Sequence, residues 1–151
     1  MLFFDADLSV ALAAFDEFWK ERNDRTVLIG SRVAPGAAIV RHQPFIKEWA
    51  GRASSLAVRA LLPLGCRDTQ CGFKLFPANM RALLPLSRTA RAEFDVEWLM
   101  IALRNGLAIK EIPVRWTNRE DSRFTFIEYP RALLELAAIK VRDMQGKYHF
   151  K

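Results

Sequence analysis

Short apolar runs alternate with amphipathic stretches along the chain, and Gly, Pro or Asn bounds most of them. The apolar runs Leu2–Phe4 and Thr26–Ile29 are typical of buried strands. Ile109–Trp116 alternates apolar and polar positions and predicts a third strand, in which Pro113 indicates an edge or a bulge. Residues 66–76 predict a polar, Gly-punctuated loop.

Apolar residues at helical spacing predict several helices between these runs. They are expected over about Val10–Arg22, 45–61, Asn79–Leu84, Phe94–Leu103 and Pro130–Met144. Strands that alternate with helices indicate an α/β fold.

Two of these helices raise the question of what their apolar faces contact. The stretch 45–61 is basic as well as amphipathic. It either lies in a membrane interface with Lys and Arg toward the headgroups, or packs on the core as most such helices do. The last helix is expected to carry one apolar face. That face consists of Leu133, Leu134, Ala137 and Val141.

Composition narrows the class of protein. The chain has 151 residues, of which 51% are hydrophobic and 26% charged, so we expect a single globular domain over residues 1–151. The net charge of +6 favours anionic partners. Nucleic acid is not expected among them, because the basic residues are dispersed and no recognition motif is present. Two cysteines are too few for a disulfide framework.

No apolar stretch approaches the length of a membrane span, and the first residues lack the basic region of a signal peptide. We therefore expect a cytoplasmic protein that is peripheral at the cytoplasmic membrane face.

Two carboxylates follow the first predicted strand. Asp5 and Asp7 lie two positions apart, so they share a face in extended geometry. Paired carboxylates suit Mg²⁺ or Mn²⁺, with water and phosphate oxygens completing the coordination. The alternative is a solvated loop in which Asp7 or Ser9 caps the next helix.

A phosphate site is one interpretation of Gly30-Ser31-Arg32, which follows the second strand. It offers a backbone turn, a hydroxyl and a guanidinium. The alternative is an ordinary turn with Arg32 on the surface.

The segment 66–76 combines charged and polar groups that a structural loop does not need. Asp68 suits a metal or acceptor site, Gln70 suits hydrogen bonding to a sugar, and Lys74 suits pairing with phosphate. The alternative is an ordered loop whose Asp and Thr satisfy backbone groups. Cys71 is interpreted as a small packed residue, because no His close in sequence could act as its base.

A second carboxylate pair, Asp95 and Glu97, lies on a predicted helix. Residues two apart on a helix do not share a face, so a paired acid/base role is disfavoured. One of the two is expected to cap or fasten the neighbouring loop.

Five phrases in sequence order resemble those of family 2 glycosyltransferases. The resemblance is greatest to dolichyl- or polyprenyl-phosphate sugar synthases of the β-glucosyltransferase (or mannosyltransferase) type. The phrases are Phe-Phe-Asp-Ala-Asp-Leu-Ser (3–9), Gly-Ser-Arg (30–32), Asp-Thr-Gln-Cys-Gly-Phe-Lys-Leu-Phe (68–76), Phe-Asp-Val-Glu (94–97) and Glu-Ile-Pro-Val-Arg-Trp (111–116).

The resemblance implies a GT-A fold, which binds a nucleotide-diphosphate sugar such as UDP-glucose or GDP-mannose. It implies that Asp5 and Asp7 hold a divalent metal and that Arg32 helps to bind a polyprenyl or dolichyl phosphate. It also implies that Asp68 and Gln70 lie in the catalytic acceptor and sugar loop. Relatives often carry a further Arg after Gly-Ser-Arg, and Lys47 takes that place here without the bidentate fork of Arg.

The chain departs from the family at its beginning. Relatives open with a strand–loop–helix run that holds the nucleotide, and the sequence lacks it. We therefore expect a partial GT-A domain, the C-terminal portion of an N-terminally truncated glycosyltransferase that transfers a hexose with inversion. The alternative is a non-catalytic remnant that associates with anionic membrane surfaces.

Overall fold

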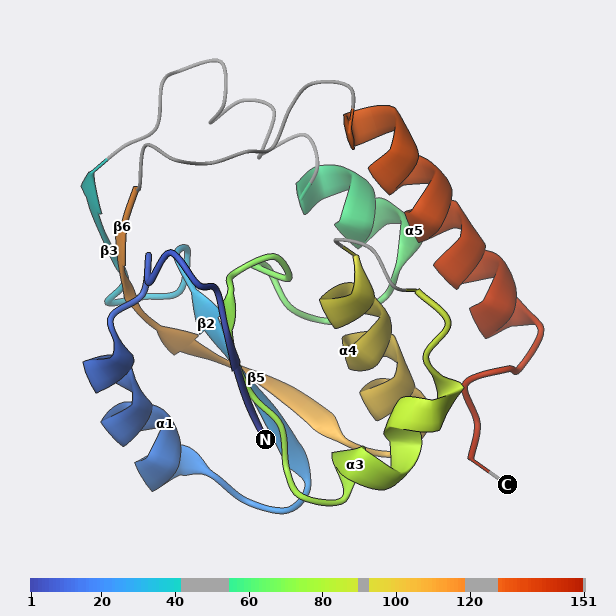
Figure 1. Ribbon diagram of the computed structural model, residues 1–151, viewed down its shortest axis with the longest axis horizontal. Coiled ribbons are helices and arrows are strands. Elements are labelled where there is room, and N and C mark those ends of the chain that lie inside the picture. The colour runs from blue at the N-terminus through green and yellow to red at the C-terminus, as the bar shows by residue number, and fades with distance from the viewer. Residues whose placement is uncertain (42–54, 90–92, 119–127, 151) are drawn as a thin grey trace.

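The computed structural model describes residues 1–41, 55–89, 93–118 and 128–150 (Figure 1). Strands and helices alternate along the chain, which confirms the α/β prediction. The strands are β1 (Leu2–Phe4), β2 (Thr26–Ser31), β3 (Ala38–Arg41), β4 (Phe73–Leu75), β5 (Ala108–Pro113) and β6 (Arg115–Thr117). The helices are α1 (Phe15–Glu21), α3 (Met80–Leu83), α4 (Phe94–Arg104) and α5 (Glu128–Met144), and residues 55–61 are also helical.

The main sheet is mixed and has the strand order β1-β4-β2-β5. Strand β4 is antiparallel to both of its neighbours, whereas β2 and β5 are parallel. The prediction that residues 66–76 form only a loop was therefore wrong at Phe73–Leu75. The local pattern hides this strand because it is short and carries Lys74, a charged residue, at its centre.

A second, two-stranded sheet pairs β3 with β6 in parallel. Strand β3 was not predicted, and the predicted strand Ile109–Trp116 divides into β5 and β6. Pro113 ends β5, which lies at an edge of the described sheet, as expected for a residue without a backbone donor. Ser31 at the end of β2 accepts a hydrogen bond from the Val114 amide, so the two sheets meet there.

Helices cover both faces of the main sheet (Figure 1). Alternation along β2 sends Val27 and Ile29 into the larger core with α4, α5 and the helical segment 55–61. Leu28 points the other way, into a smaller core that includes Phe18 of α1.

The first helix is shorter than its pattern predicted. Val10 forms a bridge with Trp116, and Ser9 accepts a hydrogen bond from Thr117. These contacts hold residues 9 and 10 in extended geometry, so helical structure begins only at Leu12, as a 3-10 turn (Leu12–Ala14) that continues into α1 at Phe15.

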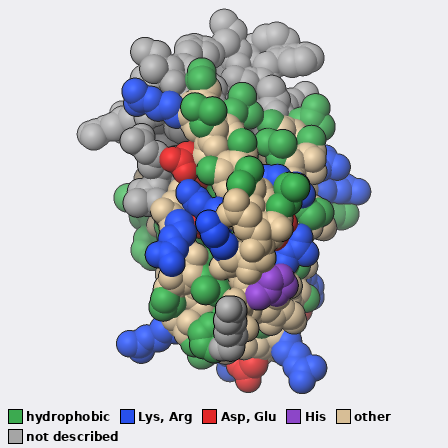
Figure 2. All heavy atoms as spheres, turned by 90° about the vertical axis from the view of Figure 1, so that its right-hand side faces the viewer, with side chains coloured by type: hydrophobic (Ala, Val, Ile, Leu, Met, Phe, Trp, Pro, Cys, Tyr) green, Lys and Arg blue, Asp and Glu red, His purple; other side chains and the backbone are tan. Residues whose placement is uncertain are grey.

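Helix α5 confirms the predicted element but corrects its face. The buried apolar residues are Ala132, Leu136 and Ile139, and Leu136 and Ile139 belong to the larger core. The face that the sequence indicated points outward instead, and Figure 2 shows apolar side chains along it. Both faces are apolar at helical spacing, so periodicity alone cannot tell which of them is buried.

A buried carboxylate fastens the end of the chain to this core. Glu97 is fully buried and accepts hydrogen bonds from the Tyr148 hydroxyl (2.7 Å) and the Arg142 guanidinium (3.0 Å). It also accepts bonds from the Ser87 hydroxyl and from the Thr89 amide. The expectation that one carboxylate of this pair fastens a neighbouring loop is thereby confirmed.

Burial disfavours the charge of Glu97, but the hydrogen bonds from Tyr148 and the 87–89 segment outweigh it and lower the pKa below 4.5. A lowered folded-state pKa contributes stability above the unfolded pKa, and that stability is lost as the pH falls through the folded value.

We predict that Glu97→Gln lowers the free energy of unfolding at neutral pH by about 3 kcal/mol, because it leaves buried donors unmatched. The gap between the variant and the wild type should narrow as the pH falls through the lowered folded-state pKa of Glu97. Urea unfolding at a series of pH values measures both effects. Glu17→Gln, at an exposed position of α1, is the matched control. A gap that is independent of pH would contradict the assignment.

Candidate active site

Asp5, the first of the two predicted metal ligands, lies directly after β1 and against the segment 66–76. Its backbone amide donates to the Gly72 carbonyl at 2.9 Å. Its carboxylate lies so close to the Gly72 Cα that a Cβ at position 72 would overlap the carboxylate oxygens. A side chain at position 72 would displace the Asp5 carboxylate, so this glycine allows two predicted parts of the site to lie in contact.

Asp7, the second predicted ligand, is oriented by the residue that follows the turn. Its two oxygens accept from the Ser9 amide (2.9 Å) and the Ser9 hydroxyl (2.8 Å). Leu8, between them, has a positive φ of 52°, an uncommon conformation for a branched residue. The turn is thus shaped to direct the Asp7 carboxylate, and each oxygen keeps a further lone pair.

The charges around Asp5 bear on whether a metal fits. Burial and then the Asp7 charge raise the pKa of Asp5, while Lys74 and Arg32 act against that shift. A carboxylate whose charge is disfavoured by a neighbouring carboxylate is stabilised by a cation that both can bind. In the described part of the chain, no three His, Cys, Asp or Glu side chains are grouped to hold a metal. Mg²⁺ is commonly held by one or two carboxylates plus substrate phosphates, so the donor set fits it.

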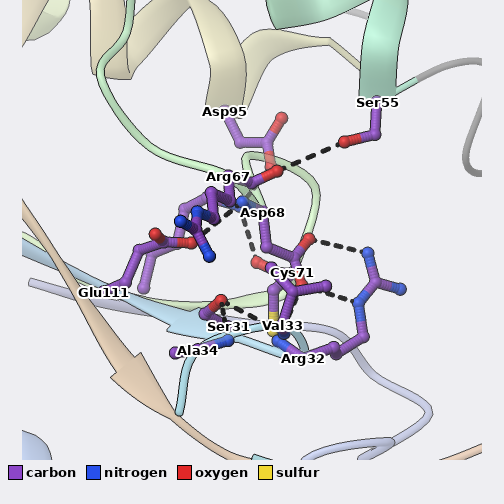
Figure 3. Close-up of polar contacts among 11 residues, drawn as sticks. Ser31, Arg32, Val33, Ala34, Ser55, Arg67, Asp68, Cys71, Asp95 and Glu111 are labelled. Carbon is purple, nitrogen blue, oxygen red and sulfur yellow. Dashed lines mark hydrogen bonds and ion pairs between the residues drawn. The ribbon is translucent and has the colours of Figure 1, made fainter.

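Arg32 follows β2 and forms a bidentate ion pair with Asp68, drawn in Figure 3. Nε and Nη2 of Arg32 donate to the two carboxylate oxygens at 2.8 and 2.7 Å, and the Arg32 backbone amide donates as well, at 2.8 Å. The Arg32 side chain remains 30% exposed, and its guanidinium lies over the Trp116 ring, 5.5 Å from the centroid. Two predicted site residues, 36 positions apart, thus hold each other in place.

Two further residues support this cluster: Ser31, which belongs to the predicted phosphate site Gly30-Ser31-Arg32, and Glu111, for which no role was predicted. Glu111 of β5 accepts a hydrogen bond from the Asp68 amide at 2.9 Å, which fixes the backbone that carries the Asp68 side chain. The Ser31 hydroxyl accepts from the Val33 and Ala34 amides and shapes the turn after Arg32. Glu111 belongs to the predicted strand Ile109–Trp116, but only the tertiary structure shows that it faces Asp68.

Lys74 lies beneath this cluster and is fully buried. Its ammonium donates to the Asp95 carboxylate at 2.6 Å and to the Cys71 carbonyl at 2.7 Å. In this structure its charge is therefore directed to Asp95. Cys71 is buried as predicted, and burial raises the pKa of its thiol to about 12, which makes it a poor nucleophile.

Two predicted site residues, Gln70 and Lys47, remain. Gln70 is half-buried in the same segment, two residues after Asp68. Lys47, and most of the predicted helix 45–61, lie outside the described residues.

We predict that Gly72→Ala destabilises the fold by about 1–3 kcal/mol, because the added methyl group displaces the Asp5 carboxylate. The same change in an Asp5→Ala background should cost clearly less. Thermal or urea unfolding of the four proteins of this double-mutant cycle gives the coupling energy. Equal costs in both backgrounds would show that the Asp5–Gly72 contact does not constrain the site.

The sequence was compared with known proteins. No protein-family model and no solved structure matches it. A dolichyl-phosphate β-glucosyltransferase from Drosophila melanogaster is 31% identical over 160 residues, which cover 98% of this chain and 48% of the relative. One from Dictyostelium discoideum is 30% identical over 87% of this chain and 41% of the relative. One from Trichomonas vaginalis is 27% identical over 100% of this chain and 47% of the relative.

The chain spans about half the length of the curated relatives that it matches. Its mixed sheet with helices on both faces agrees with part of a GT-A-type fold. The chain is therefore a relative, over most of its length, of the dolichyl-phosphate β-glucosyltransferases, a group of family 2 glycosyltransferases.

Proposed function

We propose that this chain forms the metal- and acceptor-binding part of a glycosyltransferase that moves a hexose from a nucleotide-diphosphate sugar to polyprenyl or dolichyl phosphate. The proposal rests mainly on one observation. The segment 66–76 contacts Asp5 through Gly72 and Arg32 through Asp68, so it brings these predicted site residues together. The names of the relatives support the acceptor class.

On the acceptor side, Arg32 is the residue proposed to meet the lipid phosphate. A guanidinium has five N–H donors, and the side chain of Asp68 uses one on Nε and one on Nη2. The donors of Nη1 and one on Nη2 have no described partner, and the side chain is partly exposed. Because Asp68 and Trp116 already hold the guanidinium, little side-chain entropy remains to be lost when a phosphate binds.

On the donor side, Asp5 and Asp7 are the residues proposed to hold Mg²⁺ or Mn²⁺. A bound cation would offset the charge of the departing nucleotide diphosphate. The chain itself fixes the direction of both carboxylates, through Gly72 for Asp5 and through Ser9 for Asp7.

The main catalytic task proposed for the protein is to position the acceptor phosphate against the sugar. A phosphate monoester is largely ionised at neutral pH, because its second pKa is about 6, so its oxygen needs little help from a general base. Holding that oxygen against the anomeric carbon allows a single displacement with inversion. Gln70 is proposed to orient the sugar from the same segment.

The metal site is tested by titrating Mn²⁺ into the full chain by calorimetry, first alone and then with UDP-glucose or GDP-mannose. We expect Asp7→Asn to weaken Mn²⁺ binding at least about tenfold, since it removes one of only two carboxylates. Asp16→Asn, in the exposed first turn of α1, should leave it unchanged. Absence of Mn²⁺ binding, with or without the nucleotide sugar, would refute metal binding by this chain.

The acceptor site is tested with a soluble short-chain polyprenyl phosphate. Arg32→Lys keeps the charge but loses the planar fork, so we expect about tenfold weaker binding without loss of the fold. Arg25→Lys, at an exposed position before β2, is the matched control. Equal binding by the two variants would place the acceptor phosphate elsewhere.

A further inference from the structure

The outward face of α5 is a continuous apolar strip that no described residue covers. Leu134 and Met144 are 72% and 75% exposed, and Leu133 and Val141 are about half exposed. We name this strip the apolar ridge. It consists of Pro130, Leu133, Leu134, Ala137, Val141 and Met144.

The apolar ridge is larger than the scattered apolar residues of an ordinary surface. Its members recur at helical spacing over 15 positions, which corresponds to about 21 Å of helix with no charged residue along its centre. The opposite side of α5 is also apolar and packs on the larger core. The exposed strip is therefore a second apolar face, in addition to the face that the core requires. A continuous exposed strip of this kind marks a surface that another apolar phase or molecule covers.

Cations border the apolar ridge. Lys140 and Arg131 lie on either side of it on α5, and Lys147 follows the helix. Figure 2 shows Lys and Arg side chains around the apolar ones, and Asp and Glu side chains are few on this face.

The carboxylates near α5 offset these cations only in part. Glu135 lies one helical turn after Arg131, and the Arg104 hydrogen bonds and, less strongly, the Lys140 charge lower the pKa of Asp143.

The two buried carboxylates have other cations as their ion-pair partners. Asp143 forms an ion pair with Arg104, and the buried Glu97 forms one with Arg142. Asp143 is itself buried, so neither carboxylate reaches the surface that the ridge presents.

We propose that the apolar ridge of α5 is the surface by which the chain docks on an anionic lipid membrane. Apolar side chains enter the boundary between headgroups and acyl chains, while Lys140, Arg131 and Lys147 meet the lipid phosphates. Among the described residues, no helix is long and apolar enough to cross a membrane.

A second copy of the chain is a poorer occupant of the ridge. A two-fold symmetric contact would place each ridge against the other and bring the two basic borders together. Like charges brought together across an interface oppose association, whereas an anionic lipid surface attracts the same charges.

The docking proposal rests on the proposed function, because the proposed acceptor is a lipid phosphate and such a lipid lies in a membrane. The structure connects the two surfaces. Leu136 and Ile139 of α5 share a core with Val58 of the helical segment 55–61. Ser55, which begins that segment, donates to the Arg67 carbonyl at 3.2 Å, next to Asp68. Docking of α5 would therefore set the orientation of the acceptor site to the bilayer.

The test is flotation of the full chain with phosphatidylcholine vesicles, with and without phosphatidylglycerol and without any polyprenyl phosphate. The wild type should float with the anionic vesicles. Leu134→Glu and Met144→Glu should each reduce the partition coefficient about tenfold or more. Leu12→Glu, at an exposed position far along the chain from α5, is the matched control and should float as the wild type does.

A charge series separates the two contributions. Lys140→Gln and Arg131→Gln should each weaken binding to anionic vesicles about fivefold and leave binding to neutral vesicles unchanged. Circular dichroism and light scattering on every variant report folding and mass.

Three outcomes would overturn the docking proposal. The wild type does not float, or Leu134→Glu floats as well as Leu12→Glu. In the third outcome, a ridge variant changes the mass measured by light scattering and leaves flotation unchanged, which would assign the ridge to a protein interface. Binding of Mn²⁺ and of soluble acceptor is measured without vesicles, so failure of the proposed function is seen separately.

Discussion

The insertion of β4 between β1 and β2 is the constraint on which the site depends. Its backbone hydrogen-bonds to both neighbours, and both pairings are antiparallel. The segment that leads into β4 must therefore pass the ends of β1 and β2 from which Asp5 and Arg32 emerge. Gly72 and Asp68, both in that segment, are the contacts that result. Carboxylates and a guanidinium that are distant in sequence meet because one short strand is shared.

The same strand carries a buried charge, and this explains how a strand with a polar centre is stable. Lys74 is expensive to remove from water unless it is paired and hydrogen-bonded. Asp95 from α4 and the Cys71 carbonyl satisfy it, so the strand is specified by a partner from another element. Glu97, two positions further on α4, performs the corresponding task for the 87–89 segment and Tyr148. The pair that sequence spacing placed on different faces thus fastens two different parts of the fold.

These contacts show what the sequence could and could not predict. The long periodic helix α4 and the apolar strand β2 were predictable, because packing agrees there with local pattern. The candidate site was predictable as a set of phrases in order, but none of its pairings was. Neither the Arg32–Asp68 pair nor the support from Glu111 leaves a local signal, because the partners are 36 and 43 positions apart. Strand β4 was missed because Lys74 interrupts its apolar pattern.

Arg32 is paired with the Asp68 carboxylate, whereas the cations that border the apolar ridge are only partly neutralised. The two surfaces are therefore suited to different tasks. Arg32 and Asp68 form a neutral pair, so the site would hold a phosphate through the direction of its remaining N–H donors more than through net charge. Long-range attraction to an anionic surface must then come from elsewhere, because a neutral pair exerts little field beyond about 10 Å at ordinary ionic strength. Lys140 and Arg131 are offset only in part, by Asp143 and Glu135, because Asp143 is paired mainly with Arg104. Attraction to the membrane and recognition of the phosphate would therefore be carried by different residues, joined through the core beneath α5.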